Sequence, residues 1–173
     1  MTYNIDTQHS SAQFKVRHMM IANVKGEFDK LSGTVEFDPA NAALSSVEAK
    51  IDVNSISTRE TDRDNHLKSA DFFDAAQFPE IAFKSKKVAA AGSGFKITGD
   101  LTIHGVTRPV TLSVEGPTPP QMDPWGNVRI GLEATTKIDR KDFGLTWNTA
   151  LETGGILVGD TVHITIEAEF IKG

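Results

Sequence analysis

The sequence predicts an all-β fold, an eight-stranded antiparallel barrel with one short helical insert at about residues 58–74. Most of the chain alternates apolar and polar residues, which is the period of a β-strand with one buried face. In each alternating stretch one phase is apolar and the other is polar or charged, so each strand offers one face to an interior and one to water. A closed barrel of about eight strands removes exposed sheet edges and can enclose one small ligand.

Eight stretches carry this alternation, and together they span a single domain, residues 1–173. In chain order they are residues 13–20, 27–38, 46–54, 81–88, 95–104, 107–115, 128–138 and 161–171. Residues 22–26 are expected to form a turn, and Gly33 inside the second stretch indicates a bulge or a sharp bend. The proline-rich residues 116–127 are expected to form a surface loop, because strand-like sequence continues after them.

The helical insert is marked by a change of period and by signals for a helix start. Ser57 with Glu60 three residues later fits a capping box, in which each side chain satisfies a backbone N–H group at the helix start. Asp64 and Lys68 form an i,i+4 pair in the favourable order. These features predict a helix of about three turns between two strands.

Three basic residues, Arg59, Arg63 and His66, fall on one face of this helix, and Phe72 and Phe73 follow its end. The basic cluster is either a structural network that clasps the helix to the barrel or a head-group site, and we favour the clasp. The two aromatic side chains either pack the helix onto the barrel or cap a cavity inside it.

Composition excludes several classes of function. The net charge is −5 and no run of Lys or Arg exceeds two residues, which argues against binding nucleic acid or an anionic membrane surface. With no cysteine, disulfides, thiolate catalysis and zinc–thiolate sites are excluded. No apolar run approaches the roughly 20 residues of a spanning helix, so we expect no stable membrane insertion. The first residues lack a basic and an apolar signal region, so a cytoplasmic location is expected.

The five histidines are scattered and show no metal-binding spacing, so no metal site and no cofactor are predicted. His18 differs because it lies in the apolar phase of the first strand. It is either a hydrogen-bonded, half-buried residue or a polar group at the mouth of a pocket. His104 and His163 are expected to be surface residues of a turn or strand.

Other short motifs are not catalytic. Residues 142–144 (DFG) match the magnesium triplet of kinases, but the chain is too short and lacks a nucleotide loop. The glycine-rich turn at Gly154 and Gly155 is not a phosphate loop, because no Lys-Ser or Lys-Thr follows it. Residues 139–142 are expected to be a solvated turn, in which Arg140 could pair with a carboxylate across the barrel rim. Because no nucleophile or carboxylate pair stands out, we predict no catalytic residues.

Blocks along the whole chain resemble the YceI family of lipocalin-like, polyisoprenoid-binding proteins. The matching blocks occur in order and with family-like spacing. They are residues 6–10 (DTQHS), 14–19 (FKVRHM), 24–28 (VKGEF), 55–58 (SIST), 63–67 (RDNHL), 71–74 (DFFD), 78–83 (FPEIAF), 99–107 (GDLTIHGVT), 138–140 (IDR) and 142–144 (DFG).

The resemblance implies an extended, lipocalin-like barrel with an elongated apolar channel. Such a channel would hold a polyisoprenoid or another long-chain amphiphile, such as an isoprenoid quinone or a fatty acyl compound. It also implies a homodimer. Many relatives are exported to the periplasm, and the missing signal sets this sequence apart from them.

Together, strand phase and resemblance predict a non-enzymatic carrier, store or scavenger of such a ligand. One alternative is an enzyme that modifies the lipid, with His18, Arg63 or Asp64 as acid–base groups. The other is a ligand-free, stress-associated structural barrel with a solid interior. The residues expected to contact the ligand are Phe14, Val16, His18, Met20, Phe28, Val35, Phe72, Phe73, Phe83, Ile97, Ile103, Leu132 and Phe143.

Overall fold

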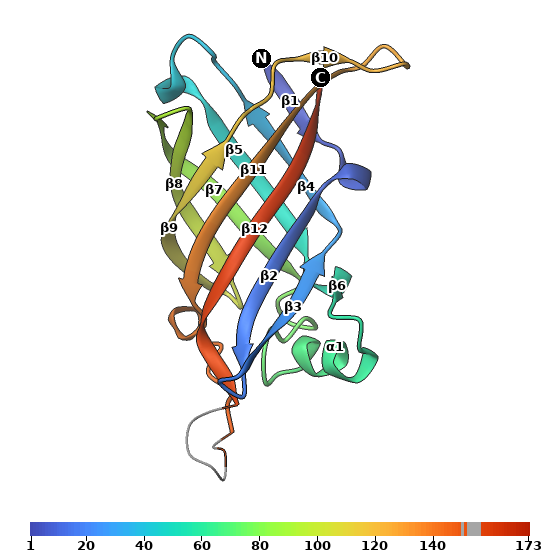
Figure 1. Cartoon of the computed structure of the whole chain (residues 1–173), viewed down its shortest axis with the longest axis vertical. Helices are drawn as coiled ribbons and strands as arrows, with labels where there is room; N and C mark the ends of the chain where they lie inside the picture. Colours follow the sequence, from blue (N-terminus) through green and yellow to red (C-terminus); the bar gives the residue numbers. More distant parts are fainter. Residues whose placement is uncertain (150, 152–156) are drawn as a thin grey trace.

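A computed structural model describes residues 1–149, 151 and 157–173, and these form a closed antiparallel barrel with a short helix at one end (Figure 1). Two ring positions are each shared by two short strands, β1 (Thr2–Ile5) with β2 (Ser11–His18), and β3 (Ala22–Phe28) with β4 (Leu31–Glu36). The other six positions are β5 (Ser46–Asp52), β7 (Glu80–Ala91), β8 (Gly94–Ile103), β9 (Val106–Glu115), β11 (Val128–Asp139) and β12 (Val158–Lys172). The described chain therefore confirms the predicted eight-stranded barrel.

The barrel closes where β11 pairs with β12. β11 pairs with β12 from Arg129 opposite Ile171 to Asp139 opposite Thr161 without a break. On its other side β12 pairs with β2 from Val158 to Glu167 and with β1 near its end. Closure leaves no long exposed edge in this part of the sheet, which protects it from pairing with other chains.

Two minor strands and four short 3-10 turns complete the described elements. β6 (Ile56–Ser57) pairs with the end of β3, and β10 (Gln121–Met122) pairs with the start of β11. The 3-10 turns are η1 (Thr7–His9), η2 (Ala42–Leu44), η3 (Val53–Ser55) and η4 (Arg140–Phe143). β10 lies within the expected proline-rich surface loop, and that segment connects β9 to β11 at the end of the barrel where both termini lie (Figure 1).

The sequence placed the first hairpin turn too late in the chain. Residues 22–26, expected to be a turn, belong to β3, which pairs with β2 from His18 opposite Ala22 onward. The reversal occurs at Met19 and Met20, whose φ angles are 52° and 61°. Asn23 and Gly26 are turn-forming residues, but cross-strand pairing overrides that local preference. β1 was not predicted at all, because four residues are too few to show an alternation.

Gly33 does not mark a bulge, because β4 and β5 pair without a register shift through Gly33 opposite Ala49. Its φ is 148°, and a Cβ atom there would collide with the Glu48 carbonyl oxygen. The glycine is needed for this close approach of two backbones.

The predicted inside and outside phases of the strands are confirmed. On β11, Ile130, Ala134 and Ile138 are buried, while Glu133 and Thr135 are exposed. The apolar phase forms three packed clusters along the barrel, and the charged phase faces water. Burying the apolar phase is the main favourable contribution to folding in such a barrel.

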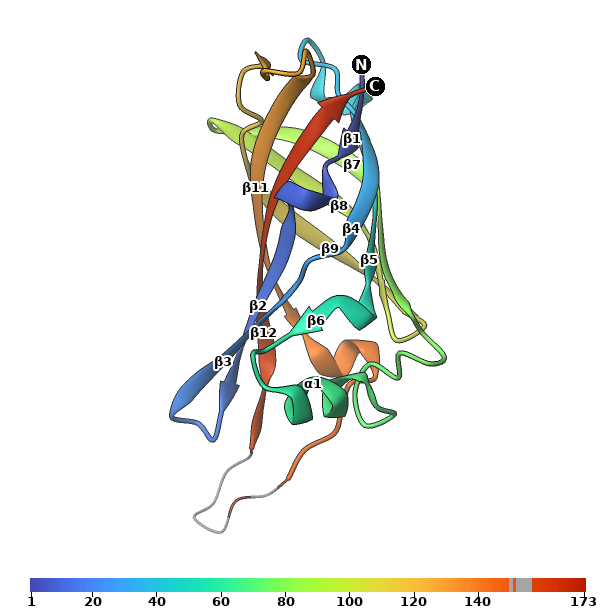
Figure 2. The same ribbon diagram turned by 90° about the vertical axis from the view of Figure 1, so that its right-hand side faces the viewer.

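The helical insert is shorter than predicted and begins later. α1 (Thr61–Lys68) lies across one end of the barrel (Figure 2), beside the orange turn of η4. Its N-cap is Glu60, whose carboxylate accepts hydrogen bonds from the backbone N–H groups of Asp62 and Arg63. The predicted capping box with Ser57 is therefore wrong, since Glu60 supplies the cap itself. Among the described residues, no helix has the length and apolar character needed to cross a bilayer.

Candidate functional site

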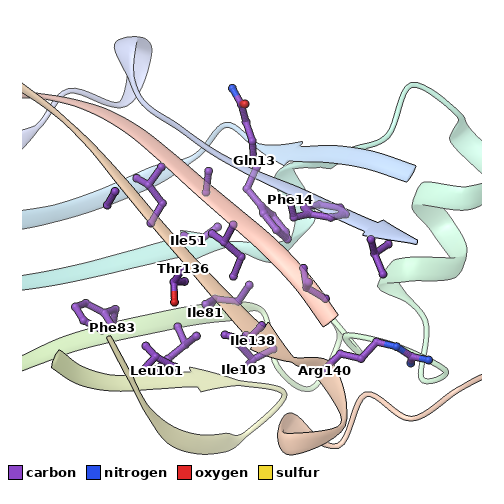
Figure 3. A pocket seen from close by; sticks show the side chains of 18 of the residues that line it. Gln13, Phe14, Ile51, Ile81, Phe83, Leu101, Ile103, Thr136, Ile138 and Arg140 are labelled. Carbon is purple, nitrogen blue, oxygen red and sulfur yellow. The ribbon is translucent and has the colours of Figure 1, made fainter. Parts of the chain in front are cut away.

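The barrel encloses a cavity of about 320 Å³, walled by side chains from strands all around the ring. Figure 3 shows Ile51, Ile81, Leu101 and Ile138 turned toward the same space from separate strands, with Arg140 at one end. The alternation of each strand explains this wall, because most inward positions are apolar; Gln13, His18 and Thr136 are polar exceptions. A cavity of this size falls within the range of small-molecule sites in proteins.

Eleven of the thirteen residues expected to contact a ligand line this cavity. Strand phase was sufficient to find most of them, since inward positions of a barrel share one surface. The eleven are Phe14, Val16, His18, Phe28, Val35, Phe72, Phe73, Phe83, Ile97, Ile103 and Leu132.

The structure places Met20 and Phe143 elsewhere. Met20 lies at the tip of the β2–β3 hairpin with 58% of its surface exposed, because the chain reverses there instead of continuing inward. Phe143 lies in η4 and is 1% exposed, packed inside the core cluster and not on the cavity wall. Neither position belongs to the regular strands, so phase could not place them.

Aromatic side chains gather at the α1 end of the cavity. Phe72 lies 5.3 Å from Trp147 between ring centroids, and the His66 ring lies 5.1 Å from Phe72 and 4.8 Å from Trp147. Phe73 meets Phe28 edge to face at 5.8 Å. The segment after α1 therefore both anchors the helix and forms part of the cavity wall. Trp147 was missed because it lies in an irregular segment without periodicity.

Thr58 is the centre of the clasp predicted for the helical insert. Arg63 donates from Nε to Thr58 Oγ1 and from Nη2 to the Thr58 carbonyl oxygen, both over 2.8 Å. The Asp64 carboxylate accepts from the Thr58 backbone N–H over 2.7 Å and from its hydroxyl over 2.5 Å. Thr58 is 5% exposed, so these bonds are shielded from water. Because Asp64 is engaged there, the expected pair with Lys68 does not form.

Arg140 is buried and not part of a solvated turn. It is 3% exposed and donates to the carbonyl oxygens of Leu145, Trp147 and Gly159 over 2.6, 2.9 and 2.8 Å. Burial lowers the pKa of its guanidinium, and the nearby carboxylates, Asp160 foremost, oppose that change. Arg140 thus ties η4 to the start of β12 at the end of the cavity.

His18 is half-buried at the end of β2 and lines the cavity. Among the described residues its ring forms no hydrogen bond, so the placement favours a polar group at the mouth. His104 packs edge-on against Phe78 at 4.9 Å between ring centroids, and His163 is exposed on β12.

A cluster of ion pairs on the outside of the barrel was not predicted. Asp6, His9 and Glu169 bring potential ligand atoms within 4.8 Å of one another. Arg129 lies among them, with Nη1 2.6 Å from Asp6 and 3.3 Å from Glu169. We assign the cluster a structural role, because the guanidinium already neutralises the carboxylates that a cation would need.

Hydrogen bonds from Arg129 lower the pKa of two carboxyl groups, those of Asp6 and Asp123. The Arg129 hydrogen bond, followed by that of His9, lowers the pKa of Asp6. At Asp123, burial acts to raise the pKa, but hydrogen bonds from Arg129 and from the backbone of Asn127 and Trp125 outweigh it and hold the pKa at about 2. Sequence spacing could not reveal this cluster, since it joins segments at both ends of the chain.

A closed antiparallel barrel around an apolar cavity, with a short helix across one end, defines the lipocalin-like class. Within that class, the chain belongs to the YceI family, since the model of the YceI-like domain matches residues 3–170. A UPF0312 protein of Staphylococcus aureus is 39% identical over 170 residues, which cover 97% of this chain and 96% of the relative.

Solved structures agree with this assignment. A YceI protein of Campylobacter jejuni is 34% identical with a TM-score of 0.75, over 91% of this chain and 90% of that one. A polyisoprenoid-binding domain from Saccharophagus degradans shares the fold, with a TM-score of 0.71 and 18% identity over 99% of this chain and 98% of that one.

Proposed function

We propose that this protein binds a long-chain amphiphile, such as a polyisoprenoid, an isoprenoid quinone or a fatty acyl compound, inside the barrel. The observation that carries the proposal is the cavity of about 320 Å³ with its almost wholly apolar wall. The S. degradans domain of the same fold is named for polyisoprenoid binding, so this barrel is compatible with such a ligand.

The energetics of an apolar wall suit this ligand class. Removing an alkyl or prenyl chain from water contributes about 0.8 kcal/mol per CH₂ group, so a chain of roughly 15–20 carbons gains on the order of 10 kcal/mol before ordering costs. Binding of the tail then needs no strong polar contact. Aliphatic walls discriminate weakly between tails of similar bulk, so selectivity would depend on polar groups at the mouth.

A carrier, store or scavenger is favoured over an enzyme by the placement of the candidate acid–base groups. Arg63 and Asp64 are both engaged with Thr58, where they hold the helix. His18 has no carboxylate partner among the described residues that line the cavity. A ligand-free structural barrel would need a solid interior, and the cavity counts against that alternative.

The proposal is tested by obstructing the cavity in its middle. Ala134 is 3% exposed, lines the cavity and pairs with Val114 and Ile166, so Ala134→Phe would place a ring across the passage. We expect the variant to bind an environment-sensitive alkyl fluorophore at least tenfold more weakly, and to lose about 1–3 kcal/mol of stability through overpacking.

Thr135→Phe is the matched control, because Thr135 is the next residue on β11 and is exposed on the outside. It should bind the fluorophore as the wild type does. If Ala134→Phe remains folded and binds as tightly as the control, the tail does not occupy this cavity and the proposal fails. The homodimer and the cytoplasmic location remain predictions, which light scattering and fractionation of the source cells would test.

A further inference from the structure

The titratable side chains that line the cavity are all basic and gather at its α1 end. They are Arg17, His18, Arg63, His66 and Arg140. Within the described residues, no aspartate or glutamate lines the cavity, although the whole chain has 23 acidic residues against 18 lysines and arginines. The local charge of the cavity end is therefore opposite to the net charge of −5.

Contacts around Trp147 and the start of β12 bring this group together. Arg140 donates from Nη1 to the Trp147 carbonyl oxygen and from Nε to that of Gly159. The His66 ring lies 4.8 Å from the Trp147 ring. His18 pairs with the residue before Gly159 on β12. Figure 2 shows α1 and the turn of η4 together at this end of the barrel. Three separate elements, α1, η4 and the end of β2, thus contribute basic side chains to one end of the cavity.

Arg63 keeps donor capacity beyond the clasp. A guanidinium has five N–H donors, and Arg63 uses one on Nε and one on Nη2 to bind Thr58. In the described part of the chain the Arg63 guanidinium forms no direct ion pair with a carboxylate. The neighbouring Asp64 carboxylate accepts hydrogen bonds from Thr58 instead. Arg63 can hold α1 and still donate to a ligand at the cavity end.

Two carboxylates lie near the other basic side chains, His66 and Arg140. Asp71 lies 2.9 Å from His66. Asp160 lies 3.9 Å from Arg140 but 3.2 Å from Lys141, so its charge is divided between two cations. Asp64 balances Arg63 through the Thr58 that they share, but Arg17 forms no ion pair among the described residues, so the opening retains a positive excess.

We propose that the α1 end of the cavity binds an anionic head group of the ligand, a carboxylate or a phosphate monoester, while the tail extends into the barrel. This inference rests on the proposed function. Hydrogen bonds between a cationic donor and an anion are roughly twice as strong as neutral ones, and shielding from water strengthens them further. A neutral alcohol with the same tail would accept hydrogen bonds but gain little from the charge.

The test uses three probes with one saturated 12-carbon tail, dodecanoate, dodecyl phosphate and 1-dodecanol, each displacing an alkyl fluorophore from the delipidated protein. We expect the two anions to bind at least tenfold more tightly than the alcohol, with the preference falling as salt rises. The tighter of the two anions identifies the head group as carboxylate-like or phosphate-like.

Variants locate the site. Arg63→Gln and His18→Gln should each lower the ratio of anion affinity to alcohol affinity about threefold or more. His18 has no hydrogen bond in the described structure, so its variant tests the site even if Arg63→Gln loosens α1. Arg59→Gln is the matched control, because Arg59 is exposed, does not line this cavity and should behave as wild type.

The outcomes separate this inference from the proposed function. If all three probes bind with equal affinity, the anionic head group is refuted while tail binding stands. If the anions are preferred but neither variant changes the preference, the assignment to this end of the cavity is wrong. If no probe displaces the fluorophore, the proposed function fails, and this inference fails with it.

Discussion

Replacing Arg140 with methionine should destabilise the protein strongly, because its buried guanidinium satisfies three carbonyl groups, one of them fully buried. The bonds run to Leu145, Trp147 and Gly159 at 2.6–2.9 Å. Methionine retains much of the length but has no donor, so each oxygen loses its partner. An unpaired buried acceptor costs about 1–3 kcal/mol, which gives an upper limit of roughly 3–9 kcal/mol for three. The bonds to Trp147 and Gly159 are only partly buried, so the actual cost lies at the lower end.

Two effects reduce this loss. Removing the buried cation relieves its desolvation penalty, and water can reach some of the orphaned oxygens from the cavity mouth. We therefore expect a net loss of about 3 kcal/mol in the free energy of unfolding. If the free energy of unfolding decreases by about 2 kcal/mol for each molar increase in urea, the unfolding midpoint should fall by about 1.5 M.

Equilibrium unfolding in urea, followed by tryptophan fluorescence, measures this change. Lys141→Met is the matched control, since Lys141 is exposed and its ion pair with Asp160 should contribute less than about 1 kcal/mol. A midpoint for Arg140→Met within the range of the control would refute the structural role of the buried guanidinium.

Two further predictions concern other parts of the barrel. Folding lowers the pKa of Asp6 and that of Asp123, the latter to about 2, so their stabilisation is present at neutral pH and is lost as pH falls from about 4 toward 2. In Arg129→Met, the free energy of unfolding in urea should fall less steeply between about pH 4 and about pH 2 than in the wild type. The same pH dependence in variant and wild type would contradict the assignment. Thr58→Val removes the hydroxyl at the centre of the clasp and should cost about 2 kcal/mol. Hydrogen exchange of the α1 amides should accelerate in that variant, and unchanged protection would show that the clasp does not hold the helix.

The barrel could be predicted because its signal repeats. In residues 128–138 and 161–171, which fall within β11 and β12, the alternation is long enough to fix both the strand identity and the inward phase by pattern. The same phase located most of the cavity wall. Ala22–Phe28 was placed wrongly at its start because Asn23 and Gly26 favour a turn locally, whereas pairing with β2 decides the structure.

Residues outside regular strands could not be placed from pattern. Arg140 has a sequence environment typical of an exposed turn, and its burial follows from carbonyl groups of distant segments that converge on it. Trp147 meets His66 and Phe72 through tertiary contacts that leave no periodic trace. The N-cap of α1 is Glu60 and not Ser57 as expected, because either side chain could supply an acceptor near that helix start.

The central claim, that the barrel holds a long-chain amphiphile, is tested most directly by native mass spectrometry of freshly purified protein, followed by lipid extraction. We predict one molecule with a long apolar tail for each chain, released on denaturation and rebound when the delipidated wild type is mixed with the extract. Ala134→Phe should carry less of it than Thr135→Phe. Recovery of the wild type without any bound tail, together with no affinity for prenyl or acyl probes, would contradict the claim.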